Sequence, residues 1–158
     1  MEDDFSLSLS WQMKFTCVEA GSWMSRRTYI DSNILIAAFL GQGDLGSSAL
    51  QIIDDDDRQL VASDAVRLET LPKPRYEGNQ TEIDFYETIF NYAEVLPWTT
   101  NVLSLAQQLA EKYGIAAMDA IHVSFAVSAK VDELVTKEKS TKPMFRVQEI
   151  PIRSISSA

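Results

Sequence analysis

Short apolar runs alternate with longer segments of helical periodicity from residue 28 onward. Short apolar runs favour buried strands, whereas apolar residues spaced three and four apart favour helices. We expect strands at 28–30, 59–62, 94–96, 133–136 and 145–150. We expect helices at 33–40, 45–53, 63–71, 82–93, 101–113 and 118–130. Strands that alternate with helices pair in parallel, so the predicted fold class is α/β, a parallel central sheet flanked by helices on both faces.

Capping and breaking residues set the expected helix ends. Ser63 or Asp64 can cap the helix that follows strand 59–62, and Asn101 can cap the helix that ends near Gly114. Pro72 and Pro74 are expected to end the helix that contains Leu71.

The N-terminal residues differ from this pattern. Residues 1–26 contain a short alternating stretch, and we predict that they form an extension outside the fold. An additional strand or flap is the alternative. The predicted domain covers 27–151, with a short tail at 152–158, and Met24 is the expected natural start of the chain.

Composition limits the class of protein. The 158 residues fit one domain, and 46% of them are hydrophobic, which is enough for a core. Cys17 is the one cysteine, so no intrachain disulfide forms. No apolar run reaches the roughly 18 residues of a membrane span, and the first residues lack a basic signal-peptide region, so we expect a cytoplasmic protein. A net charge of −9 argues against coating nucleic acid, but a metal site is itself acidic.

Four acidic residues stand beside apolar segments that are far apart in the sequence. Asp31 directly follows strand 28–30, Glu69 lies in the helix after strand 59–62, Asp119 begins a helix, and Glu138 closely follows strand 133–136. Ligand sites in parallel sheets form beyond the carboxyl ends of the strands, so these carboxylates are expected to converge. A carboxylate in an apolar setting requires compensation, and a hard divalent cation with oxygen ligands provides it.

The motifs around these acids resemble the PIN-domain family, in particular small members similar to VapC toxins. The resemblance spans roughly 28–151 and rests on Asp31-Ser32-Asn33, the segment 63–69, Met118-Asp119-Ala120-Ile121-His122 and the segment 134–138. It implies a ribonuclease dependent on Mg²⁺ or Mn²⁺ that acts on RNA. The family's acids fall on Asp31, Glu69, Asp119 and Glu138, of which the first three would bind metal.

The resemblance also implies supporting residues and partners. Ser32 and Asn33 would orient a ligand carboxylate or a water. Glu138 departs from the aspartate that the family usually has, so a second metal position is in question. The implied partners are the RNA substrate, a cognate antitoxin, as in a type II toxin–antitoxin pair, and a second copy of the chain, packed through residues 33–53.

Each candidate has a plainer interpretation. Asp31 and Asp119 could be helix caps, Glu69 a solvated helix residue and Glu138 a loop charge. We interpret His122 as a hydrogen-bonded core residue rather than a base, and Asp64 as a cap. The alternative function is an inactive PIN scaffold that binds RNA or a protein. A phosphohydrolase of the haloacid dehalogenase type is disfavoured, since Asn33 stands where that chemistry needs a second aspartate.

Overall fold

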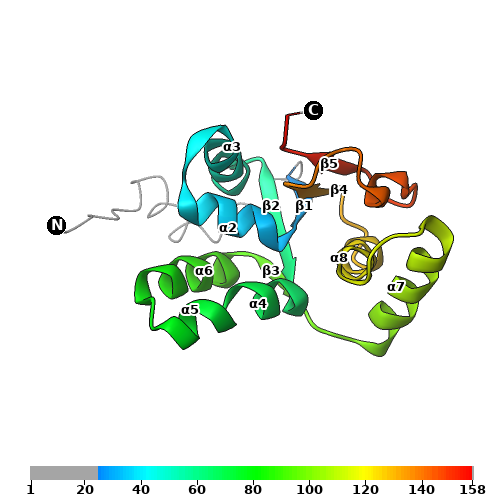
Figure 1. The fold of residues 1–158 in the computed structure, drawn as a ribbon, viewed down its shortest axis with the longest axis horizontal. Coiled ribbons are helices and arrows are strands. Elements are labelled where there is room, and N and C mark those ends of the chain that lie inside the picture. The colour runs from blue at the N-terminus through cyan, green and yellow to red at the C-terminus, as the bar shows by residue number, and fades with distance from the viewer. Residues whose placement is uncertain (1–24, 158) are drawn as a thin grey trace.

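The computed structural model describes residues 25–157, which form one α/β domain (Figure 1). The strands are β1 (Arg26–Ile30), β2 (Arg58–Ser63), β3 (Glu94–Leu96), β4 (Glu133–Thr136) and β5 (Ile152–Ser154). The helices are α2 (Ser32–Leu40), α3 (Gly43–Ile53), α4 (Asp64–Thr70), α5 (Pro72–Glu77), α6 (Gln80–Tyr92), α7 (Thr100–Tyr113), α8 (Ala117–Ser128) and the 3-10 helix η1 (Pro143–Arg146). The predicted extension over 1–26 lies outside these residues except at its end, where Arg26 begins β1.

The sheet has the order β3-β2-β1-β4-β5, and every neighbouring pair is parallel. The chain builds outward from β1 to β3 and then returns through α7 and α8 to place β4 on the other side of β1. Helices α2 to α6 therefore lie on one side of the sheet and α7 and α8 on the other (Figure 1). The predicted fold class, a parallel sheet with helices on both faces, is confirmed.

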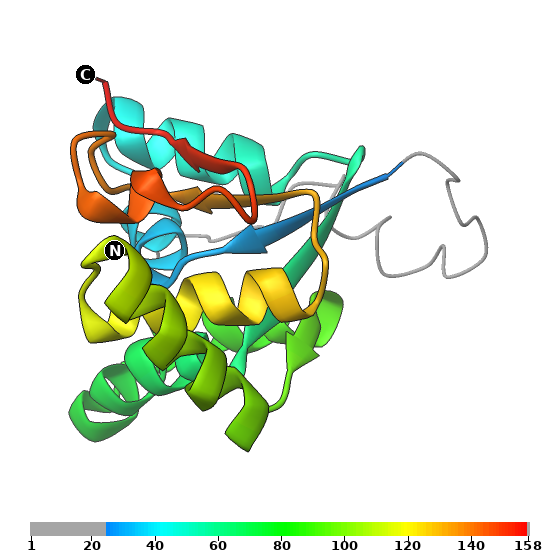
Figure 2. The same ribbon diagram turned by 90° about the vertical axis from the view of Figure 1, so that its right-hand side faces the viewer.

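This strand order creates a switch point between β1 and β4, the two strands from which the connections run in opposite directions. In open α/β sheets, ligands bind beyond the carboxyl ends of the strands at such a point. Figure 2 shows the arrowheads of β1 and β4 ending on the same side of the molecule. The fold therefore places the residues after Ile30 and Thr136 next to each other.

One predicted strand is wrong. Residues 145–150 form no strand, because Pro143 begins η1 and the segment that follows it is irregular. Val147 and Ile150 of this segment are nevertheless buried, as is Met144 just before it. The last strand is instead β5, which pairs with β4 and extends the sheet into the segment 152–158 that the sequence suggested was a tail.

Several helix ends also differ from expectation. Ser63, not Asp64, caps α4 by accepting a hydrogen bond from the Val66 amide. Thr99, not Asn101, caps α7 in the same way through the Val102 amide. Pro72 follows α4 as predicted, but it also opens α5, since proline is tolerated in the first turn of a helix. Gly114 ends α7 in the left-handed conformation, as predicted.

A buried ionic network closes the amino-terminal end of the central strands. Arg58 at the start of β2 pairs with Glu133 at the start of β4, and its Nη1 donates to Thr28 Oγ1 at 2.9 Å. Its Nε donates to Asp55 at 2.8 Å. Arg58 and Glu133 are both buried. These charges satisfy one another at the end of the sheet opposite to Asp31.

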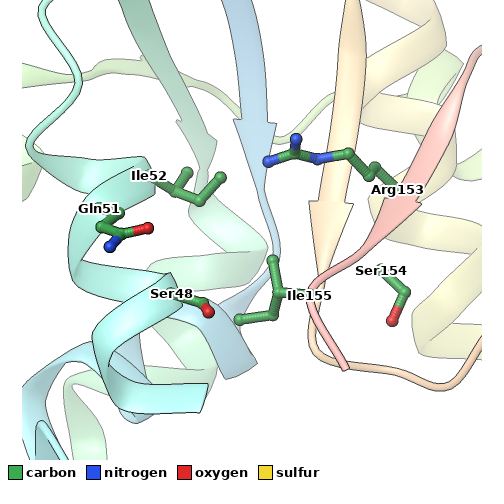
Figure 3. A pocket seen from close by; sticks show the side chains of 6 residues that line it. All are labelled: Ser48, Gln51, Ile52, Arg153, Ser154 and Ile155. Atoms are coloured by element: carbon green, nitrogen blue, oxygen red, sulfur yellow. The ribbon is translucent and has the colours of Figure 1, made fainter. Parts of the chain in front are cut away.

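A groove of about 250 Å³ lies between α3 and β5 (Figure 3). It is lined by Ser48, Gln51, Ile52, Arg153, Ser154 and Ile155. No carboxylate lines it, so it is separate from the acidic residues singled out in the sequence. No helix within 25–157 has the length and apolar character to cross a membrane.

Candidate metal centre

Asp31 lies directly beyond β1, in the N-cap position of α2, but its side chain makes no capping hydrogen bond. Its Oδ2 accepts from Thr136 Oγ1 at 2.8 Å, and its Oδ1 accepts from Ser32 Oγ at 3.2 Å. The residue is only 5% exposed. The Asp31 side chain therefore does not cap α2. Each of its two carboxylate oxygens instead accepts a hydrogen bond from a hydroxyl group.

Asn33 fixes the hydroxyl that holds Asp31. Its Nδ2 donates to Thr136 Oγ1 at 3.0 Å, and its Oδ1 accepts from the Lys137 amide at 2.9 Å. These bonds tie the first turn of α2 to the end of β4. Ser32 thus contacts Asp31 directly, and Asn33 acts through Thr136.

Glu69 reaches the same place from α4, where it meets His122 of α8. The His122 Nε2 lies 2.6 Å from Glu69 Oε2 and 3.6 Å from Asp31 Oδ1. An ionised carboxylate only accepts hydrogen bonds, so Nε2 carries the proton in this arrangement. The side chain of Glu69 is 32% exposed, whereas that of His122 is 3% exposed. The buried ring thus anchors a carboxylate that otherwise borders solvent.

The other ring nitrogen of His122, Nδ1, contacts a buried tyrosine hydroxyl, which in turn contacts a buried serine hydroxyl. Tyr29 OH lies 2.8 Å from His122 Nδ1 and 2.7 Å from Ser63 Oγ. Tyr29 and Ser63 are fully buried, and Ser63 is also the cap of α4. His122 is therefore a buried residue with hydrogen bonds at both nitrogens.

These contacts shift the pKa values of the two groups in opposite directions. Burial acts to raise the pKa of Glu69, but hydrogen bonding from His122, its charge and a hydrogen bond from Ser32 together lower that pKa below its usual value. Burial acts to lower the pKa of His122, but the Glu69 hydrogen bond and the charges of Asp31, Glu69 and Asp119 raise it. The imidazole therefore offsets part of the negative charge of the neighbouring carboxylates.

Asp119 lies in the first turn of α8, but the N-cap of this helix is Ala116. Asp119 is therefore not the cap. Burial raises its pKa, the charges of Asp31 and Glu138 raise it further, and Lys142 and His122 oppose that effect. Asp119 thus shares an electrostatic environment with Asp31 and Glu138.

Glu138 stands two residues beyond β4, and a surface lysine pairs with it. Its Oε2 lies 3.3 Å from Lys142 Nζ. Its amide donates to Thr136 Oγ1 at 3.1 Å, the same hydroxyl that contacts Asp31. The backbone of Glu138 is thus hydrogen-bonded to the hydroxyl that also contacts Asp31, while its carboxylate pairs with the Lys142 ammonium group.

Within residues 25–157, the group close enough to share an ion comprises Asp31, Glu69 and His122, whose ligand atoms all lie within 4.8 Å of one another. Asp119 and Glu138 lie outside this compact set. His122 and Thr136 were not among the residues singled out for the site. The placement of His122 one helical turn after Asp119 was a usable signal, but its pairing with Glu69 depends on how α4 and α8 pack.

The parallel sheet and its convergent carboxylates define an α/β protein with an acidic site at a topological switch point. A family model, the PIN domain, matches residues 28–142. The chain belongs to the PIN-domain family, as its motifs indicated. A search of curated proteins finds no match.

Solved structures of similar fold come from bacterial toxin–antitoxin complexes. A toxin–antitoxin complex from Klebsiella pneumoniae is 18% identical with a TM-score of 0.67, over 83% of this chain and 99% of that one. DNA-bound VapBC from Salmonella typhimurium is 15% identical with a TM-score of 0.63, over 82% and 98%. VapBC2 from Rickettsia felis, bound to a promoter DNA fragment, is 17% identical with a TM-score of 0.60, over 81% and 98%. At these identities the likeness establishes the shared fold.

Proposed function

We propose that this protein is a metal-dependent endoribonuclease, with Asp31, Glu69, Asp119 and Glu138 as its site acids. The observation that carries the proposal is the meeting of Asp31 and Glu69 with His122 at the carboxyl ends of β1 and β2. Asp31 and Glu69 come from chain segments 38 positions apart, and neither serves as a helix cap. A buried, hydroxyl-oriented carboxylate is typical of metal ligation and is otherwise unfavourable.

The donor set fits a divalent ion. Asp31 and Glu69, together with Asp119 from outside the compact group, would supply carboxylate oxygens, the ligands that Mg²⁺ and Mn²⁺ prefer. When bound, such an ion supplies Lewis acidity toward a phosphate oxygen and a water. Ser32, Thr136 and Asn33 hold the Asp31 carboxylate in one orientation.

The reaction is hydrolysis of an RNA phosphodiester. The oxygen of a water adds to phosphorus, the bond from phosphorus to the 3′-oxygen breaks, and that oxygen leaves as a hydroxyl after taking a proton. The products are a 5′-phosphate and a 3′-hydroxyl. The protein's own carboxylates orient the water and accept its proton, and no side chain is needed as a covalent nucleophile.

The direct test is cleavage of single-stranded and structured RNA by the full chain with Mn²⁺, beside an Asp31→Asn variant purified in the same way. Wild-type protein is expected to cut, and the variant is expected to be slower by about 100-fold or more, a loss typical of removing one group that stabilises a transition state. Chelation of the metal should stop the wild-type reaction. Equal cleavage by both proteins would mean that the activity comes from a contaminant or from another site.

An inactive scaffold that binds RNA or a protein is the alternative function. The contact between Glu138 and Lys142 favours it, because this pairing occupies the fourth acid. Wild-type protein that retains labelled RNA in a mobility shift, but leaves it intact with Mn²⁺, would establish the scaffold.

The fold neighbours extend the proposal to partners. Since they are toxin–antitoxin complexes, we infer that this chain is the toxin of such a pair and works in the cytoplasm. An antitoxin segment would cover the acids, and a second copy would pack against the exposed apolar side chains Ile36, Leu40 and Leu45. Co-purification with the product of an adjacent small gene, and the mass of the isolated protein by light scattering, test these two points.

A further inference from the structure

Lys142 is held at the site by its backbone. Lys142 immediately precedes Pro143, the first residue of η1. Met144, which follows Pro143, is fully buried. The Lys142 amide donates to the Lys139 carbonyl at 2.9 Å, and the Lys142 carbonyl accepts from the Phe145 amide at 3.1 Å. Residues before proline are restricted to extended conformations, so the start of this side chain is well defined.

The ammonium group pairs with one site acid, and its charge acts on a second. Lys142 Nζ lies 3.3 Å from Glu138 Oε2, and the charge of Lys142 lowers the pKa of Asp119, against burial and the charges of Asp31 and Glu138, which raise it. The glutamate at position 138 is one methylene longer than aspartate, which extends its carboxylate toward the lysine. The side chain of Lys142 is 48% exposed, so it remains accessible to a ligand.

The acids of the site are therefore divided into two parts. Asp31 and Glu69 lie with His122 in a group compact enough for one ion. Glu138 pairs with Lys142, and the charge of Lys142 also acts on Asp119, so a second divalent ion bound by these two acids would meet a positive charge. Two cations of this kind a few ångströms apart repel strongly in a partly buried site.

We propose that Lys142 takes the place of a second metal ion, so that this nuclease works with one divalent ion and one ammonium. The inference rests on the proposed function. Lys142 would donate to a non-bridging oxygen of the scissile phosphate and stabilise the extra negative charge of the transition state. A lysine can serve as a phosphate-binding point charge in this way, since its three N–H donors allow it to contact Glu138 and the phosphate together.

The test compares Lys142→Met, which keeps the length of the side chain, with Lys139→Met, which removes another exposed lysine of the same loop. Wild-type protein and Lys139→Met are expected to bind one Mn²⁺ by calorimetry and electron paramagnetic resonance. Lys142→Met is expected to bind a second, weaker Mn²⁺ and to cleave RNA about 100-fold more slowly at the Mn²⁺ concentration that saturates wild type. Lys142→Arg, which keeps the charge, should retain one ion and most of the rate.

Two results would overturn the role of Lys142 while leaving the nuclease intact. One is two Mn²⁺ ions in the wild-type protein, both lost in Asp31→Asn. The other is cleavage by Lys142→Met at the rate of Lys139→Met. By contrast, wild-type protein that binds no Mn²⁺ and cuts no RNA would overturn the proposed function, and this inference with it.

Discussion

His122 Nε2 lies 2.6 Å from the Glu69 carboxylate and 3.6 Å from Asp31, while its Nδ1 lies 2.8 Å from the Tyr29 hydroxyl. The imidazole thus connects two site acids to a fully buried tyrosine in β1. Glu69 is on a short helix at the edge of solvent, and the ring limits the orientations that its carboxylate adopts. Histidine–carboxylate contacts of this kind tune metal sites without any change in the ligands themselves.

Replacing His122 with alanine should weaken Mn²⁺ binding about 10- to 100-fold, because the Glu69 carboxylate loses its anchor. Tyr29→Phe should have a smaller effect in the same direction, since it leaves the ring in place but removes the hydroxyl that holds Nδ1. Calorimetric titration with Mn²⁺ measures both. Tyr86→Phe is the matched control, because it removes a tyrosine hydroxyl that donates to Glu82 instead. An affinity equal to wild type in His122→Ala and in Tyr29→Phe, as in the control, would contradict the anchoring role.

Asp31→Asn should leave the metal-free protein at least as stable as wild type, since it removes a buried charge near Glu69 and Asp119 while keeping an acceptor for Thr136. The same variant should lose the rise in melting temperature that saturating Mn²⁺ gives to wild type, because a ligand stabilises the state that binds it. Differential scanning calorimetry with and without Mn²⁺ measures both effects. An undiminished Mn²⁺ shift in the variant would show that the ion binds elsewhere.

Arg58→Met should destabilise the fold by about 3 kcal/mol, because the buried Glu133 loses its closest partner and keeps only Arg26 at 3.8 Å and the Thr28 hydroxyl. Urea unfolding measures this loss, and Lys73→Met, at an exposed position, should change the free energy of unfolding by less than about 0.5 kcal/mol. Mn²⁺ affinity should be unchanged in the folded fraction of Arg58→Met, since the network lies at the opposite end of the sheet. A large change in affinity with little change in stability would be the contrary result.

Glu149 gives a pH dependence that is separate from the acids of the site. Lys112 Nζ donates to it at 2.8 Å and Tyr113 OH at 2.7 Å, and the Lys112 contact is the main cause that lowers the pKa of Glu149 to about 2. A lowered folded-state pKa stabilises the protein above the unfolded value near 4.5, and this stabilisation is lost as pH falls toward 2.

Glu149→Gln should therefore reduce stability at neutral pH by less than about 1 kcal/mol, since the pair is at the surface. The difference from wild type should shrink steadily between about pH 4.5 and pH 2. Urea unfolding over this range measures it. A difference that grows on acidification would contradict the assigned pairing.

The sequence was most informative where local chemistry decides the structure. The strand before Asp31 and the strand before Thr136 are short apolar runs, and a parallel sheet requires that their carboxyl ends meet. The placement of Asp31 beside the segment that carries Glu138 followed from this rule alone. Gly114 and Pro72 also acted as their backbone preferences require, although proline began a helix as well as ending one.

The features that the sequence did not predict depend on contacts between elements that are far apart in the chain. Val147 and Ile150 are buried, but burial does not require a strand, and Pro143 instead begins a 3-10 helix that packs against α7 and α8. The three residues of β5 are too few to show a period. No spacing in the chain pairs Tyr29 with His122 or His122 with Glu69. The sequence shows that Lys142 stands four residues after Glu138. It does not show that the charge of Lys142 also acts on Asp119.

The position of β4 between β1 and β5 also bears on synthesis. β4 is added to the first-made strand only after about one hundred further residues have emerged, and it brings Thr136 and Glu138 with it. Asp31 consequently gains the second of its two hydroxyl donors, Thr136, only after β4 has been made and has paired with β1, and such long-range parallel pairing is slow. A chain interrupted before residue 133 therefore contains Asp31, Glu69 and His122 but lacks the Thr136 hydroxyl that donates to Asp31.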